Sequence, residues 1–286
     1  MAKGRELKGR IKSVENTRKI TRTMEMVATS KMKRAQDRVV AARPYAIALG
    51  DVISSLYSPD LAERFPLLRQ PTAMRRAAVI LLTSNRGLAG AFNANLIKEA
   101  RAVVSRLESD GVVVDLHVVG KKGLGYFRYV GRNVASSRID IGDNPTANDA
   151  RGLVDGLVQD FVTGALDAVY VVYAKFNSAL STPPVADQVL PVTPPRQSGV
   201  QKDYLLFPSA DAILSELLPL YVRNTVYRAL VETVAGEQGA RRTAMKNATD
   251  NANDMLNILR RTYNRARQAQ ITQEIAEIVG GAAALE

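Results

Sequence analysis

The chain has no cysteine among its 286 residues. This absence excludes disulfide bonds, thiolate metal sites, cysteine nucleophiles and thiol redox control. Long apolar runs are also missing. The longest run of aliphatic residues, Ala77 to Leu82, is far shorter than the roughly 20 residues with which a helix crosses a bilayer. The charged N-terminus lacks the apolar core of a signal peptide. We therefore expect a soluble protein, or one peripheral to a membrane.

Positive charge is in excess and is unevenly placed. The chain has 39 Lys and Arg against 28 Asp and Glu, a formal charge of +11. Residues 1–43 alone hold thirteen Lys or Arg against four carboxylates, a local balance of +9. Such a segment is attracted to nucleic acid, to anionic lipid or to an acidic protein surface. The charge alone does not choose among these partners.

Both ends of the chain carry apolar residues at alternating spacings of four and three, the period of a coiled coil. The N-terminal pattern has slips after Val14 and after Val27, and its members are Leu7, Ile11, Val14, Ile20, Met24, Val27, Met32, Ala35 and Val39, continuing to Leu56. The C-terminal pattern runs without a slip from Ile213 to Leu259 and resumes at Ile271, Ile275 and Ile278. Each end therefore predicts one long amphipathic helix.

The expected lengths of these helices exclude burial inside a compact domain. At roughly 1.5 Å per residue, helices over 5–57 and 211–281 would be about 80 Å and 105 Å long. Two such helices, separated by a folded domain, most simply pair as a long antiparallel coiled coil that projects from it. The C-terminal helix reaches farther than its partner.

The middle of the chain alternates β-rich and helical runs. Strand-like runs at 77–83, 112–120, 134–139 and 168–176 are separated by helical patterns at 93–108, 121–129 and 146–162, and extended pieces follow near 185–193 and 202–207. This order predicts an α/β fold with a central doubly wound, Rossmann-like sheet that is mainly parallel and has an antiparallel edge. The expected domains are the N-terminal helix 1–58, the α/β domain 74–208 and the C-terminal helix 209–286.

The sequence offers little that resembles an active site. The run SNRGLAGAFN at 84–93 lies between a predicted strand and a helix, but it lacks both the third glycine of a dinucleotide-binding loop and the Gly-Lys-Ser/Thr of a P-loop. A tight turn permitted by Gly87 and Gly90 is the simpler interpretation. The run GKKGLG at 120–125 fails in the same way, and His117 lies alone within an apolar strand. We expect no catalytic residue, no metal site and no cofactor.

Polar residues inside the second apolar pattern are more informative. Asn224, Gln238 and Arg241 occupy expected core positions, where polar groups lower stability and commonly fix the register of a coiled coil. Gly236 and Gly239 lie beside two of them. This region is a locally loose coil, a contact with a partner or a pliable section of the helix.

The basic N-terminal segment leaves one further alternative open, a coiled-coil protein that binds nucleic acid through helical Lys and Arg. However, the segment has no aromatic residue before Tyr45, and its charges share the helix with an apolar stripe. A solvated or partner-facing flank of a coiled coil fits this pattern better. A nucleotide-dependent enzyme that uses the middle domain is a weaker alternative.

Several blocks resemble one family in order along the chain. They are IKSVENTRKITRTMEMVATSKMKRAQ (11–36), LLTSNRGLAGAFN (81–93), AKFNSAL (174–180), ALVETVAGEQGARRTAMKNATDNA (229–252) and YNRARQAQITQEIAEIVGGAAAL (263–285). These blocks are similar to those of F-type ATP synthase gamma subunits, in a bacterial-like form without a transit peptide or a cysteine-bearing insertion. Such subunits are non-catalytic.

The resemblance implies a central-stalk rotor subunit that transmits torque between a proton-driven membrane ring and a catalytic hexamer. The implied partners are the alpha and beta subunits of the hexameric head, the epsilon subunit and the membrane c-ring, with no nucleic acid and no small-molecule substrate. The implied location is the cytoplasmic side of the cell membrane, as a peripheral protein. Matching motif positions assign contacts with the head to Met24, Arg241, Arg267, Gln268, Thr272 and Glu274.

Overall fold

The computed structural model describes residues 2–57, 64–71, 73–178, 181–193 and 209–283. The chain divides into two compact units: Met1–Val27 with Arg242–Glu286 forms the first, and Ala28–Arg241 forms the second. Two long helices, α1 (Ala2–Leu56) and α6 (Ala210–Ala283), contribute residues to both units. The two helices predicted from the spacing of apolar residues are therefore present.

The second unit contains a five-stranded sheet with the order β3-β2-β1-β4-β5. Strands β1 (Arg76–Leu82), β2 (Val113–Val119), β3 (Ser136–Arg138) and β4 (Ala168–Ala174) are parallel, and β5 (Pro184–Leu190) pairs antiparallel with β4. The chain moves outward from β1 to β3 and then returns to the other side of β1. The predicted doubly wound α/β fold with an antiparallel edge is confirmed, while the extended piece predicted at 202–207 lies outside the described residues.

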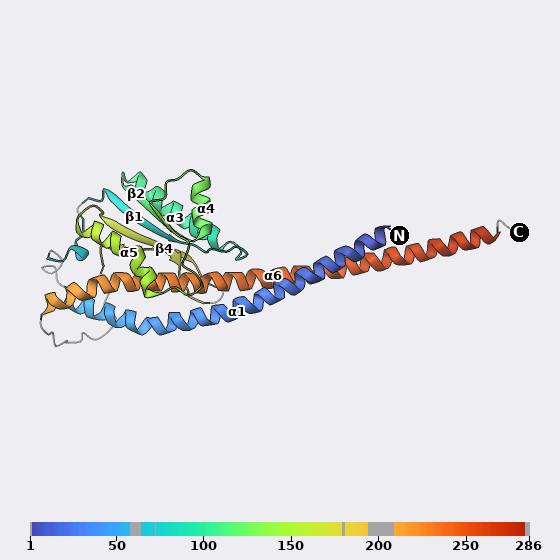
Figure 1. Ribbon diagram of the computed structural model, residues 1–286, viewed down its shortest axis with the longest axis horizontal. Coiled ribbons are helices and arrows are strands. Elements are labelled where there is room, and N and C mark those ends of the chain that lie inside the picture. The colour runs from blue at the N-terminus through green and yellow to red at the C-terminus, as the bar shows by residue number, and fades with distance from the viewer. Residues whose placement is uncertain (1, 58–63, 72, 179–180, 194–208, 284–286) are drawn as a thin grey trace. The chain divides into compact units, whose positions relative to one another are not determined.

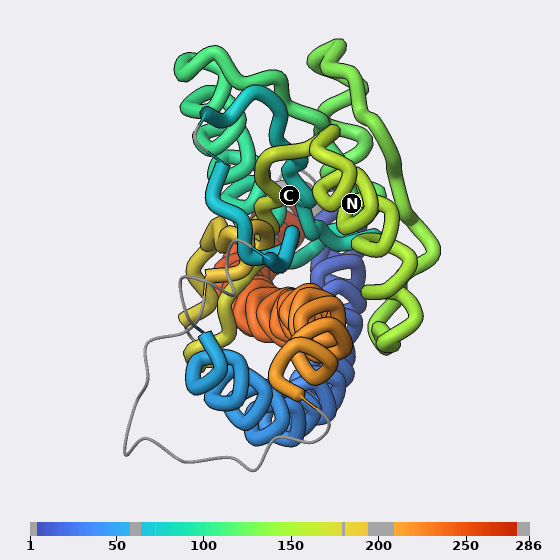
Figure 2. Tube along the Cα trace, turned by 90° about the vertical axis from the view of Figure 1, so that its left-hand side faces the viewer, coloured from blue at the N-terminus to red at the C-terminus, as the bar shows by residue number. Residues whose placement is uncertain are grey.

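Helices cover both faces of this sheet, as Figure 1 shows. One face packs against α3 (Phe92–Ser109) and α4 (Lys121–Tyr129). The other packs against α5 (Ala147–Val162), the short 3-10 turn η1 (Pro66–Leu68) and part of α6. Figure 2 shows part of α1 beyond α6, where it contributes to the same core. Because β1 lies at the centre of this three-layer arrangement, six of its seven residues are buried.

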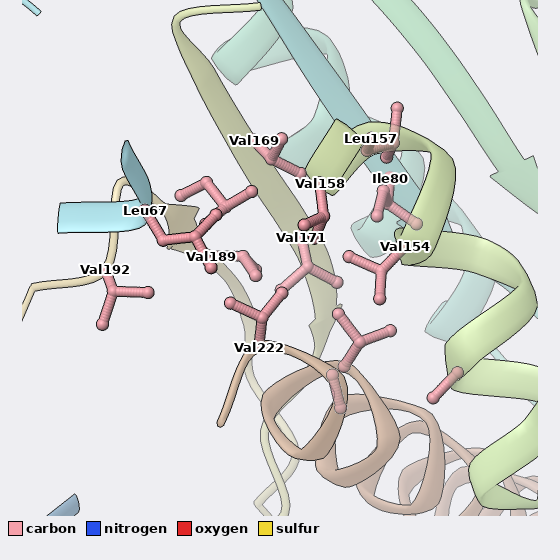
Figure 3. Packing of buried hydrophobic residues seen from close by; sticks show 14 of the residues in the cluster. Leu67, Ile80, Val154, Leu157, Val158, Val169, Val171, Val189, Val192 and Val222 are labelled. Carbon is pink, nitrogen blue, oxygen red and sulfur yellow. The ribbon is translucent and has the colours of Figure 1, made fainter. Parts of the chain in front are cut away.

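The core on the α5 face is built from branched aliphatic side chains. Figure 3 shows Val154 and Val158 of α5 pointing toward Ile80 and Val171 of the sheet, with Val222 of α6 approaching from below. Non-directional packing of this kind holds α6 against the sheet because it removes apolar area from water.

The face that α6 turns toward this core differs from the predicted one. The fully buried residues recur every four positions, at Leu214, Leu218, Val222 and Val226, whereas Leu220 of the predicted pattern is 38% exposed. Residues four apart form a ridge along a helix that packs across a broad surface. Residues at alternating spacings of four and three form the narrow seam of a coiled coil. Here α6 packs on a sheet as well as on another helix, which the sequence pattern did not reveal.

Among the described residues, one helix is long and apolar enough to cross a membrane: within Arg5–Leu56 an 18-residue window reaches a mean hydropathy of 1.3. This segment has a high average hydropathy although it contains no long uninterrupted apolar run. The C-terminal part of α1 buries Leu49, Ile53 and Leu56 in the core of the second unit. A core helix can have the same length and hydropathy.

In the first unit, α1 and α6 pair in antiparallel orientation through cross-helix polar contacts. Arg260 contacts Glu15 at 2.6 Å, Arg18 donates to Asn253 at 3.2 Å, and the hydroxyl oxygens of Thr21 and Thr249 lie 2.8 Å apart. As the residue number rises along α1, its partner's number falls along α6. The predicted antiparallel pairing of the two end helices is thereby confirmed.

Polar residues replace apolar ones in this paired face. Arg18 and Thr21 continue the spacing of four and three from Val14, while Ile20 points outward and is 60% exposed. On α6 the buried residues are Met245, Thr249, Ala252 and Leu256, and Met255 is exposed. The slip predicted after Val14 is therefore absent, because the pattern passes through polar side chains that find partners across the interface.

Candidate functional site

The carboxyl edge of the parallel sheet is where a doubly wound α/β fold places a ligand, in the crevice where the strand order reverses. In this chain the crevice lies between β1 and β4 and is bordered by loop 84–91, which follows β1. The loop is held at its base, since the Ser84 amide donates to Asn93 Oδ1 at 3.0 Å and Asn93 Nδ2 donates to Ser84 Oγ at 2.9 Å. At its tip, Leu88 has φ 62° and is 63% exposed. A large apolar residue is thus held in a left-handed conformation and presented to solvent.

Helix α6 covers this edge of the sheet with its own polar side chains. The Phe176 amide donates to Glu232 Oε2 at 2.9 Å, and the Ala174 amide lies 3.4 Å from Thr233 Oγ1. Backbone groups at the end of β4, which in a ligand-binding fold would be free to meet a substrate, are therefore satisfied by α6.

A small cavity of about 140 Å³ remains at this edge, and its lining includes Ser84, Asn85, Asp143 and Glu237. Sites for drug-sized ligands and cofactors usually occupy about 300–1,000 Å³. The cavity is too small for a nucleotide, because the helix fills the rest of the crevice.

Arg241, one of the residues that the family resemblance assigned to a partner contact, lies in the second unit and is 8% exposed. Its guanidinium forms an ion pair with Glu237 and donates to the carbonyl of Gly87 at 3.3 Å. Burial raises the pKa of Glu237 above its ordinary value, and the charge of Arg241 opposes that rise. The pair therefore fastens α6 to loop 84–91, one residue before the exposed Leu88.

Gln238 also contacts the α/β domain. The residue is 2% exposed, and its Nε2 lies 3.4 Å from Asp143 Oδ1. Asp143 also accepts a hydrogen bond from Lys31 of α1, at 2.5 Å. Two of the three polar residues predicted in the coiled-coil core, Gln238 and Arg241, thus meet polar groups of the sheet domain, whereas Asn224 is partly exposed.

Gly236 is buried because α6 approaches the sheet closely at this point. A Cβ added to it would lie 3.1 Å from Ala174 Cβ and 3.3 Å from both Phe92 Cε2 and Thr182 Cβ. These distances are shorter than ordinary van der Waals contacts. The small size of Gly236, and not its freedom of rotation, is what the packing uses; Gly239 is buried as well.

Four other predicted contact residues, Arg267, Gln268, Thr272 and Glu274, lie together on an exposed part of α6 in the first unit. Glu274 accepts a hydrogen bond from Gln270 at 3.0 Å, and the Thr272 hydroxyl donates to the carbonyl of Gln268 at 3.0 Å. Their side chains are otherwise open to solvent. Met24, on α1 of the same unit, is partly exposed.

Exposed apolar side chains on the first unit make up a candidate interface. The large exposed residues are Ile20, Met26, Val27, Met255, Ile258, Ile271, Ile275 and Ile278. The sequence patterns assigned all of them except Met26 and Ile258 to the coiled-coil core. Every residue from 271 to 278 is exposed, and three isoleucines of this stretch recur at spacings of four and three on one face. The sequence does contain a signal for this exposure on α1. The spacing of four and three continues from Val14 through Arg18 and Thr21, which leaves Ile20 outside the paired face.

The remaining sequence candidates have structural roles. His117 Nδ1 lies 2.7 Å from Ser136 Oγ, and burial lowers the pKa of its imidazole. At the start of GKKGLG, Gly120 has φ 97°, and a Cβ there would lie 2.1 Å from the carbonyl oxygen of Thr83. Within the described residues, no group of three or more His, Cys, Asp or Glu is arranged to hold a metal ion.

Comparison with known proteins agrees with this arrangement. The family described as ATP synthase matches residues 3–285. The ATP synthase gamma chain of Gemmatimonas aurantiaca is 69% identical over 289 residues, and that of Moorella thermoacetica is 45% identical over 286, with the whole of each chain covered.

Solved structures give the same result for the fold. A central stalk and c-ring structure of the Tetrahymena thermophila mitochondrial ATP synthase has a chain that is 27% identical with a TM-score of 0.61, covering 80% of this chain and 99% of that one. A chain of the Euglena gracilis mitochondrial ATP synthase, 20% identical with a TM-score of 0.70 and covering 99% of this chain and 95% of that one, shares the fold. The two long helices, the sheet whose ligand crevice α6 covers and these matches together establish that the chain belongs to the ATP synthase gamma-chain family.

Proposed function

We propose that this chain is the central-stalk rotor subunit of a proton-translocating F-type ATP synthase. It transmits torque between the membrane c-ring and the catalytic hexamer of alpha and beta subunits, and it also binds the epsilon subunit. The proposal divides the chain by role into the helix 1–58, the α/β domain 74–208 and the helix 209–286. It places the protein at the cytoplasmic side of the cell membrane, bound peripherally through its partners.

The observation that carries the proposal is the exposed end of α6 in a member of this family. Residues 271–278 are all exposed, and Ile271, Ile275 and Ile278 lie on one face. Exposed apolar side chains in a continuous row indicate a surface that a partner covers. A single helix has low surface relief, so a partner that encloses it can bind it without deep interlocking of side chains.

The polar residues around this row suit contacts with the alpha and beta subunits. We assign such contacts to Met24, Arg267, Gln268, Thr272 and Glu274, whose side chains are exposed or partly exposed. The excess of +9 over residues 1–43 would attract acidic segments of the head. Charge complementarity of this kind is less sensitive to exact position than close packing, which suits a rotating contact.

Arg241 serves the head contact in a different way under this proposal. Because its guanidinium is buried against Glu237 and the Gly87 carbonyl, it positions loop 84–91 and the exposed Leu88. The loop, and not the arginine itself, would then meet the partner.

Nucleotide chemistry belongs to the partner subunits in this proposal, so the chain is not itself an enzyme. The support is that α6 satisfies the backbone amides of Ala174 and Phe176 at the edge where a nucleotide would bind, and leaves a cavity of about 140 Å³. That volume is well below the size of usual cofactor sites.

The deciding experiment is co-expression of the tagged full chain with the alpha and beta subunits of its own source. We expect a stable complex in which the chain co-purifies with an ATP-hydrolysing hexamer. Ile275→Asp with Ile278→Asp should weaken that complex, because charges would replace the apolar row. Val162→Asp, at an exposed apolar position on α5, is the matched control and should leave it intact.

Two outcomes would count against the proposal. Salt-sensitive duplex binding by the isolated chain, without assembly with alpha and beta, would favour a nucleic-acid-binding protein. ATP turnover by the purified chain alone would favour an enzyme.

A further inference from the structure

The loop between β3 and α5 is fastened at both ends, so it is a rigid part of the second unit. Near its start, Asn85 Nδ2 donates to the carbonyls of Ile139 at 3.1 Å and Ile141 at 2.9 Å. At its end, Thr146 and Asp149 form a reciprocal capping box at the first turn of α5. Asp143 lies between these two anchors.

The carboxylate of Asp143 joins this loop to both long helices. Its Oδ2 accepts from Lys31 Nζ of α1 at 2.5 Å, and its Oδ1 lies 3.4 Å from Gln238 Nε2 of α6. The two oxygens therefore serve two different helices at once. All three residues belong to the second unit.

A second contact on α1 supports the same loop. Arg38 donates to Asn144 Oδ1 at 2.7 Å and approaches the carbonyl of Asp143 at 3.5 Å. Lys31 and Arg38 are seven residues apart, so they project from the same face of α1. Asp143 and Asn144, which are adjacent in the loop, thus contact two cationic side chains of α1 that lie two helical turns apart.

Partial burial makes the contact at Asp143 stronger than an ordinary surface ion pair. The side chains of Lys31 and Asp143 are 34% and 29% exposed, against more than 60% for both members of the surface pair between Glu6 and Arg10. Hydrogen bonds between ionised groups are roughly twice as strong as neutral ones, and screening by solvent falls as exposure falls.

Apolar contacts also hold the helices to the sheet domain at this level, since Ala35 and Val39 of α1 share a cluster with Phe176 and with Val231 and Ala235 of α6. Such contacts are non-directional. A carboxylate bonded to both helices fixes their position relative to the loop in a way that the apolar cluster does not.

We infer that Asp143 is a mechanical joint that couples the α/β domain to α1 and α6 together, so that both helices turn with the domain. The inference rests on the proposed rotor function. Without the Asp143 carboxylate, α6 would still be held to the domain by polar contacts of Glu232, Thr233 and Arg241. Helix α1 would keep the contact of Arg38 with Asn144 and its apolar contacts. Asp143 therefore matters most for the attachment of α1.

The first test uses hydrogen exchange of the isolated full chain. Asp143→Asn keeps the size of the side chain and removes its charge, and Lys31→Met removes the other partner. Each should speed amide exchange in residues 28–40 of α1 by about tenfold, the effect of losing a charge-assisted hydrogen bond. Lys31→Arg should restore protection. Glu108→Gln removes an ion pair with Arg132 that lies within the α/β domain and should leave exchange in α1 unchanged.

The second test uses the complete ATP synthase in membrane vesicles. Asp143→Asn and Lys31→Met should lower the number of protons pumped per ATP hydrolysed, while Lys31→Arg and Glu108→Gln should not. Lys31→Met provides a test independent of Asp143→Asn should that variant fail to fold.

Each outcome decides the inference. Unchanged exchange in residues 28–40 would overturn the joint itself. Faster exchange with unchanged pumping per ATP would show a structural bond that carries no torque, and would also overturn it. If the wild-type chain did not assemble with alpha and beta subunits, the proposed function would fail, which is a distinct result because the exchange experiment needs no partner.

Discussion

Replacing Gly236 with alanine tests whether close packing of α6 on the sheet is what this glycine provides. In an exposed helix interior, alanine is more stable than glycine by about 1 kcal/mol. At Gly236, the added methyl would lie 3.1 Å from Ala174 Cβ and 3.3 Å from Phe92 Cε2. Ala174 belongs to β4 and has no flexible side chain that could move aside. Overpacking of a core costs about 1–3 kcal/mol.

The difference between these effects gives the expected sign and size. Gly236→Ala should destabilise the chain by about 1 kcal/mol, because the packing cost exceeds the gain in helix propensity. For a protein of this size, that corresponds to a fall of about 2–4 °C in the midpoint of thermal unfolding. Circular dichroism at 222 nm follows the transition, and hydrogen exchange in residues 230–241 reports whether the loss is local.

A matched control is available within the same unit. Gly156 lies in α5, is exposed, and has no atom within 4 Å of an added Cβ. Gly156→Ala should therefore raise the midpoint by about as much as Gly236→Ala lowers it. If both substitutions raised the midpoint equally, the sheet would be yielding to the extra methyl at no cost, and the reasoning from close approach would be refuted.

Three further predictions concern one buried hydrogen bond, one ion pair and one exposed residue. Thr249→Val should cost about 1 kcal/mol in urea unfolding, because it removes a buried hydroxyl 2.8 Å from that of Thr21; the double change with Thr21→Val should recover most of the loss, and additive losses would contradict this. Arg138 lowers the pKa of Asp140 to about 2, so the stability from this pair is fully present above the ordinary pKa near 4 and is lost as pH falls toward 2; Arg138→Gln should return the Asp140 midpoint in an NMR titration toward about 4, and an unmoved midpoint would exclude Arg138 as the cause. Arg267→Glu should leave unfolding of the isolated chain within about 0.5 kcal/mol, since the residue is exposed, but should reduce coupled ATP synthesis by the assembled complex; full coupling would argue against its contact with the head.

The alternation of strands and helices in the middle of the chain was predictable because it depends on local periodicity. Runs such as AAVILLT are apolar on both faces, which is typical of a central parallel strand, and β1 is indeed buried on both faces. The antiparallel edge formed by β5 was also anticipated, from the extended piece near 185–193 that follows the last strand of the alternation.

The registers of the long helices were less predictable. A search for apolar residues selected Ile20 and Met255 as core positions, although both are exposed. Arg18, Thr21 and Thr249 take part in the paired face instead, because each finds a polar partner across the interface. Whether a polar residue can occupy a core position depends on the side chain opposite it, and that residue is more than 220 positions away in the sequence.

The candidate site, too, could be predicted from the sequence only in part. The motifs located loop 84–91 after β1 and placed Gln238 and Arg241 at core positions of a helix, but they did not connect the two regions. Only the folded chain brings Arg241 to the Gly87 carbonyl, and Gln238 to Asp143. The exposure of Arg267, Gln268, Thr272 and Glu274 depends on no distant contact among the described residues.

The elements of this protein could be read from its sequence: two long helices at the ends, a parallel sheet between them, an excess of positive charge near the start and no cysteine. These properties depend on composition and on short-range periodicity. The tertiary structure decided which faces of the helices are buried, why Gly236 is small, and why the crevice at the carboxyl edge of the sheet is filled by α6. Those properties depend on which distant residues meet, since burial and hydrogen bonding are set by the partner of each side chain and not by the side chain alone.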